Sequence, residues 1–103
     1  MSKFKLDPAP TFKAKVAIPV PGGAAVPVEF EFRHFPKDEY IELFAPDNPL
    51  PDVELIEKIC VGWELDDPFN KESIEKLRQN YQAAPGAIVR KFAEEIGPAR
   101  LGN

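Results

Sequence analysis

Five residues between positions 63 and 69 are the strongest candidates for binding chemistry: Trp63, Glu64, Asp66, Asp67 and Phe69. Closely spaced carboxylates can hold a cation, but this segment lacks the spaced oxygen ligands and the glycine of a calcium loop. We therefore interpret the carboxylates as a solvated acidic loop and predict no metal site. The two aromatic residues are expected to plug the joints between helices, and a hot spot for a partner is the alternative.

His34 is the only histidine and Cys60 the only cysteine of the chain. His34 is expected at the end of a strand as a surface or loop residue. Cys60 lies on the apolar stripe of a predicted helix, which favours a small core residue over a reactive thiol. The sequence contains no phosphate-binding glycine loop and no zinc-protease motif. We predict a protein without catalysis or cofactor, and a small enzyme or regulator that uses His34 is the weaker alternative.

Composition and charge narrow the possible partners. The 103 residues are 44% hydrophobic and 29% charged, which favours a single globular domain over residues 1–103. The net charge is −4, and residues 36–70 alone carry two positive and ten negative side chains. This acidity disfavours nucleic-acid binding and favours either a solvated face or a basic partner. No apolar run reaches the roughly 18–20 residues of a membrane helix, and the N-terminus lacks the apolar core of a secretory signal.

The elements that must position these residues begin with a hairpin, predicted at about residues 11–34. Apolar residues fall on even positions over 12–18 and again over 26–32, with charged residues between most of them. This period of two is typical of half-buried strands. Residues 19–25 contain the glycines and prolines of a reversal. A register centred near Gly22 predicts these cross-strand pairs: Lys15 with Glu29, Lys13 with Glu31, Phe12 with Phe32 and Ala14 with Phe30.

Residues 36–97 are predicted to form about four short helices. Their starts are expected at Pro36, at Asp52 as the cap of a helix over about 53–61, at Asn70 as a cap, and near Pro85. Gly62 and Gly97 are expected to end the second and the last helix. The expected buried faces are Tyr40, Ile41 and Phe44; Leu55, Ile56, Ile59 and Cys60; Ile74, Leu77 and Tyr81; and Ala84, Ala87, Ile88, Phe92 and Ile96. The predicted fold is therefore α+β, an N-terminal antiparallel β-hairpin packed on a bundle of short helices, with short flexible termini.

Several short motifs together resemble one family of phage tail assembly chaperones. They are Val61-Gly62-Trp63-Glu64, Pro68-Phe69-Asn70, the helical Ile74, Leu77 and Tyr81, and the ending Ala99-Arg100 with Asn103, together with an opening Leu6-Asp7-Pro8-Ala9-Pro10-Thr11-Phe12. The resemblance spans most of the chain. The chain departs from the family pattern in two places. Its proline comes four residues after Tyr81, whereas the family tends to have a proline directly after the tyrosine. Asn70 stands where a serine cap is commoner.

The resemblance implies a phage or prophage protein of the bacterial host cytoplasm, in keeping with a chain that has one cysteine. It implies non-covalent binding to the tape-measure protein, and contact with the tail-tube protein is a further expectation. The acidic segment is expected to steer a basic stretch of that client. The alternative is a structural tail component, a connector or terminator subunit that stays in the virion. Self-association through the hairpin edge stays open, although the nearby prolines blunt that edge. No membrane, nucleic-acid or small-molecule partner is expected.

Overall fold

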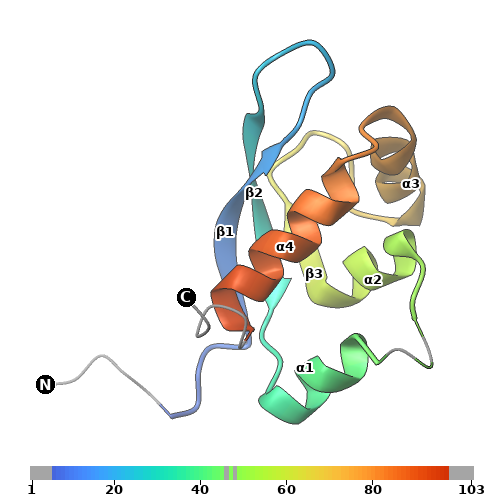
Figure 1. The fold of residues 1–103 in the computed structure, drawn as a ribbon. Helices are drawn as coiled ribbons and strands as arrows, with labels where there is room; N and C mark the ends of the chain where they lie inside the picture. The colour runs from blue at the N-terminus through green and yellow to red at the C-terminus, as the bar shows by residue number, and fades with distance from the viewer. Residues whose placement is uncertain (1–5, 46, 48, 98–103) are drawn as a thin grey trace, which may run out of the picture.

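A three-stranded antiparallel sheet and four helices make up the part of the chain that this computed structural model describes, residues 6–45, 47 and 49–97 (Figure 1). The strands are β1 (Thr11–Ile18), β2 (Val26–Arg33) and β3 (Cys60–Trp63), in the spatial order β1-β2-β3. The helices are α1 (Lys37–Leu43), α2 (Asp52–Ile59), α3 (Lys71–Asn80) and α4 (Ala84–Ile96). The α+β prediction with an N-terminal hairpin is confirmed.

The hairpin has the predicted register. All four predicted pairs occur, and the outermost pair beside the turn is Ile18 with Val26. Gly22 has a φ of 75°, which suits glycine, and the amide of Gly23 donates to the carbonyl of Val20 over 3.0 Å. A slip by one residue would turn every phenylalanine of β2 towards water, so the alternation of apolar and charged residues specifies this register.

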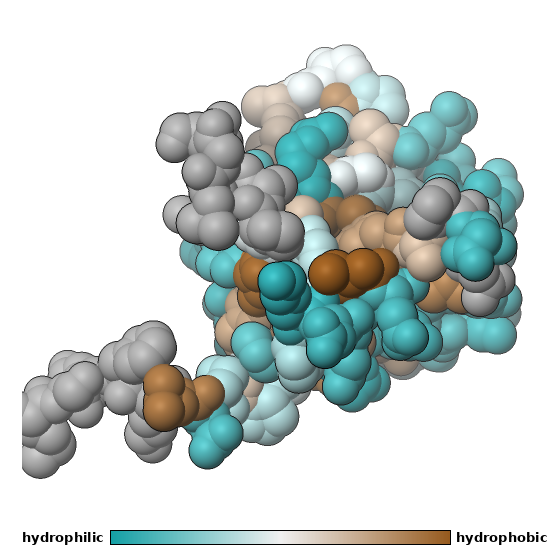
Figure 2. Space-filling model, turned by 60° about the horizontal axis from the view of Figure 1, so that its bottom comes forward, coloured by the Kyte–Doolittle hydropathy of each residue, from teal (hydrophilic) through white to brown (hydrophobic). Residues whose placement is uncertain are grey.

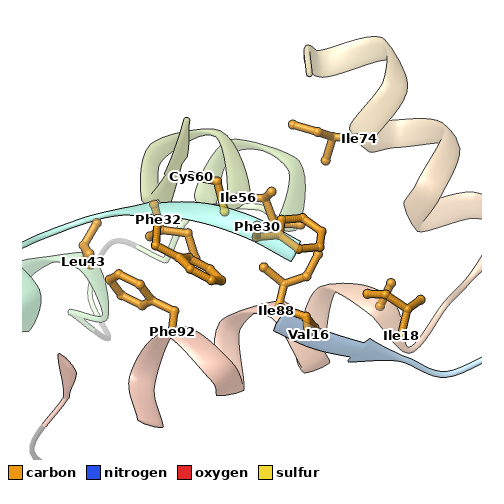
Figure 3. Close-up of a cluster of buried hydrophobic side chains, with 12 residues drawn as sticks. Val16, Ile18, Phe30, Phe32, Leu43, Ile56, Cys60, Ile74, Ile88 and Phe92 are labelled. Carbon is orange, nitrogen blue, oxygen red and sulfur yellow. The ribbon is translucent and has the colours of Figure 1, made fainter. Parts of the chain in front are cut away.

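The core lies between the sheet and the four helices, and α4 crosses one face of the hairpin (Figure 1). Figure 3 shows Phe32 of β2 and Phe92 of α4 in this layer, with ring centroids 5.9 Å apart. Phe92 also packs against Phe35, Tyr40 and Phe44, so one side chain joins the sheet, the following loop and α1. The buried apolar set is Val16, Ile18, Phe30, Phe32, Leu43, Ile56, Ile59, Cys60, Ile74, Ala84, Ile88 and Phe92.

The third strand corrects the sequence prediction. We expected a helix over 53–61 that Gly62 ends, but α2 stops at Ile59 and the next four residues form β3, which pairs with β2. Cα partners are Phe30 with Trp63 and Phe32 with Cys60, with an irregularity in register between them. Four residues show no strand period of their own, so only pairing with β2 makes this segment extended. The cap prediction was also wrong, because Asp52 is inside α2 and Pro51 precedes it without a side-chain cap.

Helix α1 turns a different face to the core than predicted. Leu43 is its buried residue, Tyr40 is half-buried, and the side chains of Ile41 and Phe44 are 55% and 38% exposed. Pro36 precedes the helix in an extended conformation instead of occupying its first turn. Figure 2 shows the side of the molecule where α1 lies, with hydrophobic surface in small areas among hydrophilic side chains.

The last two helices follow their sequence signals. The side-chain oxygen of Asn70 accepts a hydrogen bond from the amide of Ser73 over 2.9 Å and caps α3. Pro85 lies in the first turn of α4, and Gly97 follows its last residue. Among the described residues, no helix is long and apolar enough to span a membrane. The predicted flexible termini, including the Ala99-Arg100 and Asn103 ending, fall mainly on residues 1–5 and 98–103, which lie outside the described residues.

Candidate binding groove

An open groove of about 340 Å³ lies between the outer part of the hairpin, the loop after β3 and helix α3. Small-ligand pockets have volumes of roughly 300–1,000 Å³, so this groove is at the low end of that range. It has room for a few side chains of a partner. Its lining is mostly apolar: Ile18, Val20, Val26, Val28, Phe30, Trp63, Leu65, Asp67, Ser73, Lys76, Leu77, Asn80 and Tyr81.

The hairpin wall of the groove continues the core face of the sheet. Val26 and Val28 have the same strand parity as Phe30, so their side chains leave the sheet on the same side as the core. The hairpin projects beyond the helices that cover its base (Figure 1). Phe30 is therefore buried, whereas Val26 near the turn is 49% exposed. The groove arises because the apolar face of the hairpin is longer than its helical cover.

The opposite wall is one face of α3. The lining residues of this helix and its C-cap fall at helical spacing along two turns: Ser73, Lys76, Leu77, Asn80 and Tyr81. At 1.5 Å per residue, this face is about 12 Å long. Ile74 is fully buried and does not line the groove. Helix α3 therefore packs on the core through Ile74, with Leu77 partly buried beside it, and its flank faces the groove.

Trp63 positions the loop that forms the floor of the groove. Its ring meets Phe30 and Phe69 edge-on, at centroid distances of 5.9 and 5.1 Å. Its indole Nε1 donates a hydrogen bond to the backbone carbonyl of Asp67 over 2.8 Å. The prediction that both aromatic residues plug joints between helices was wrong, because Trp63 ends β3 and the two rings fill a joint between the sheet and the loop.

The three carboxylates of the loop do not gather at one place. Glu64, Asp66 and Asp67 are all exposed, as expected of a solvated loop. Asp67 lines the groove, whereas Glu64 lies at a shallow hollow on the other face of the sheet, with Lys13 and Glu31. Asp66 lines neither of these two hollows. In the described part of the chain, no group of three or more His, Cys, Asp or Glu side chains is placed to hold a metal ion.

The whole chain is similar to one known protein family. The family model described as phage tail assembly chaperone matches residues 1–103. The chain belongs to the phage tail assembly chaperone family. Searches of curated proteins and of solved structures gave no match. The family resemblance seen in the sequence is therefore confirmed.

The chaperone's two candidates for nucleophilic chemistry lie outside the groove. Cys60 is fully buried, and burial raises the pKa of its thiol to about 12, against a smaller opposing effect of Arg33. The thiol is therefore protonated at neutral pH, as a core residue would be. His34 follows β2 and is partly exposed, and its backbone amide donates to the carbonyl of Pro10 over 2.9 Å.

Three exposed apolar residues of the chaperone line the groove together, and the sequence analysis did not name them as candidate binding residues. Val26, Leu65 and Tyr81 are 49%, 41% and 36% exposed, and each comes from a different segment. We assigned Tyr81 to a buried helix face and Val26 to the apolar face of the hairpin, and Leu65 was not singled out. A signal was present for Val26, because the even-numbered apolar run continues right up to the turn. Nothing in the sequence joins Leu65 to the other two.

Proposed function

We propose that this chaperone binds the tape-measure protein non-covalently, by seating apolar side chains of a client helix in the groove between the hairpin and α3. The observation that carries the proposal is the convergence of Val26, Leu65 and Tyr81, three exposed large apolar residues, on one groove of a tail assembly chaperone. Large apolar residues left exposed together on a small protein mark interaction surfaces.

The chemistry of the groove suits a long helical client. A tape-measure protein, as the family resemblance implies, is a long helix with apolar stripes that need cover until the tail tube forms around it. The α3 face presents residues at helical spacing, against which a second helix can pack ridge into groove. Each apolar side chain that becomes fully buried contributes about 1.5–3 kcal/mol. Part of this favourable free energy offsets the translational and rotational entropy that is lost on association. A groove that admits only a few side chains therefore supports weak, reversible binding.

The proposal includes the setting of this binding. The chaperone acts in the cytoplasm of the host bacterium, without catalysis, and releases its client as tail-tube subunits polymerise. Contact with the tube protein at that stage is part of the same proposal. The apolar lining supports a holding role, in which the groove shields client surface and the polar rim keeps the complex soluble.

Trp63 offers a direct test, because it is the only tryptophan and lines the groove. Overlapping peptides that cover the tape-measure protein of the same phage, chosen without tryptophan, are titrated into the full chain. We expect saturable changes in Trp63 emission with peptides that carry an apolar stripe. Leu65→Ser should weaken this binding at least fivefold. Ile41→Ser is the matched control, since it removes an apolar residue of α1 that is 55% exposed, against 41% for Leu65, and it should change the affinity less than twofold.

Two results would contradict the proposal. One is wild-type protein that binds no tape-measure peptide, and the other is an Ile41→Ser variant that loses as much affinity as Leu65→Ser. Mass spectrometry of purified virions addresses the structural alternative, because a connector or terminator subunit stays in the particle at fixed stoichiometry. We expect the chaperone to be absent from those virions and present in lysates during tail assembly.

A further inference from the structure

Two charged side chains of opposite sign, Asp67 and Lys76, line a groove that is otherwise mostly apolar. Asp67 lines the groove together with Trp63 and Leu65 of the same loop. Its backbone is held by the indole of Trp63, whose Nε1 donates to the Asp67 carbonyl over 2.8 Å. The aspartate therefore has a defined place beside the apolar surface that a client would cover.

The surroundings of Asp67 leave its carboxylate available. Lys76 of α3 also lines the groove, but the ion pairs of the described residues are Arg78 with Glu75 and Lys91 with Glu95. The Asp67 carboxylate accepts no side-chain hydrogen bond within the described part of the chain. A partner that covers the groove would take this charge partly out of water, where an unpaired carboxylate is unfavourable and a paired one gains strength.

We infer that Asp67 selects the client: it pairs with a lysine or arginine that lies beside the apolar stripe of the bound helix. This rests on the proposed function and adds the chemistry of the preferred segment, an amphipathic helix with a cation at the edge of its apolar face. Charge complementarity at the groove identifies this occupant, since the carboxylate is adjacent to the apolar lining. A neutral or acidic helix with the same apolar residues is a poorer client.

Asp66 provides a close control for this inference. It is the neighbouring residue, carries the same charge and is exposed, but it does not line the groove. Asp66→Asn and Asp67→Asn change the net charge equally, so long-range steering of a basic client should slow association to a similar extent in both. A direct ion pair between Asp67 and a cation of the client lowers the dissociation rate instead, so only its loss should raise that rate. Asp67→Asn leaves the backbone carbonyl that accepts from Trp63 Nε1 unchanged, so the loop is expected to keep its fold.

The test measures association and dissociation rates of the full chain with the tightest-binding tape-measure peptide and with versions in which each lysine or arginine is changed to glutamine. We expect Asp67→Asn to raise the dissociation rate at least fivefold and Asp66→Asn to change it less than twofold. One peptide substitution should reproduce the loss, and Asp67→Asn should then add no further loss. Lys76→Gln should leave dissociation of the basic peptide unchanged or slow it.

The outcomes separate the two claims. Equal dissociation rates for the Asp66→Asn and Asp67→Asn variants would overturn the selective role of Asp67 while leaving client binding intact. Tight-binding peptides that carry no lysine or arginine would overturn it as well. If wild-type protein binds no tape-measure peptide, the proposed function falls and this inference falls with it. Thermal melting and Trp63 emission of each free variant show that a loss reflects the changed charge and not unfolding.

Discussion

The side chain of Tyr40 occupies the space that a side chain at position 97 would need. A Cβ placed on Gly97 would meet the hydroxyl oxygen and the Cζ atom of Tyr40, and would lie 2.7 Å from the carbonyl oxygen of Ala93. The φ of Gly97 is −83°, so this glycine is required by close approach and not by its backbone conformation. The contact closes α1 against the end of α4, where Tyr40 also stacks on Phe92.

Gly97→Ala should therefore destabilise the protein. We expect a loss of about 1–3 kcal/mol in the free energy of unfolding, the usual range for overpacking a filled site. Gly86→Ala is the matched control, because no atom lies within 4 Å of its added Cβ and the residue is in α4. That change should stabilise by up to about 1 kcal/mol through helix propensity. Urea unfolding of both variants measures the difference, and equal effects would disprove the close-approach argument.

Asn70 should contribute to stability through its cap on α3. Asn70→Ala removes the acceptor of the Ser73 amide and should lower the free energy of unfolding by about 1 kcal/mol. Asn70→Ser and Asn70→Asp keep an acceptor oxygen and should remain within a few tenths of a kcal/mol of the wild type. Chemical denaturation compares the three variants. A serine variant as unstable as the alanine variant would show that the hydrogen bond is unimportant.

The buried thiol of Cys60 should make stability fall at alkaline pH. The folded-state pKa is raised to about 12 by burial, whereas an unfolded cysteine titrates near 8.5. Above that lower value the unfolded chain releases a proton that the folded chain retains. The contribution to stability is therefore complete below about pH 8.5 and declines by up to about 1.4 kcal/mol per pH unit as the pH rises.

The measurement for Cys60 is the slope of unfolding free energy between pH 8 and pH 10. Cys60→Ala lacks the titrating group, and its slope should be shallower than that of the wild type even though its absolute stability is lower. Parallel slopes would mean that the thiol does not remain protonated in the folded state. Thiol-reactive reagents at pH 8 should modify native wild-type protein only as fast as it unfolds.

Trp63→Phe should separate packing from loop positioning. Phenylalanine can keep the aromatic contacts to Phe30 and Phe69 but cannot donate to the Asp67 carbonyl. We expect a loss of about 1 kcal/mol, the usual net value of one hydrogen bond, and faster amide exchange over residues 64–69. Hydrogen-exchange mass spectrometry measures the second effect. Unchanged exchange in this loop would show that the indole does not hold it.

The parts of the fold that the sequence predicts correctly are those with repeated local signals. Val16, Phe30 and Phe32 belong to runs with period two, which specify both strands and their register. Asn70 and Gly97 mark helix ends by chemistry that acts within one turn. These signals need no information about distant residues, and this is why they are readable in one chain.

The errors occur where distant contacts decide the structure. Cys60 falls four residues after Ile56, so helical spacing accounts for it as well as a strand does, and only pairing with Phe32 resolves the choice. In α1, Leu43 is buried and Ile41 exposed because Phe92 and Gly97 set the orientation of that short helix. The groove was missed for the same reason, since its walls meet only after the sheet is complete.

The groove consists of residues from three stretches of chain, 18–30, 63–67 and 73–81. No single stretch carries both walls, so an unfolded or partly synthesised chain has no site to offer. A client that recognises only the complete groove acts as a ligand of the native state, and its presence shifts the folding equilibrium by mass action. At a client concentration 100 times the dissociation constant, this coupling adds about 2.7 kcal/mol to the stability of the bound protein. Client and chaperone would then protect each other from unfolding, and the release of one exposes the other to turnover.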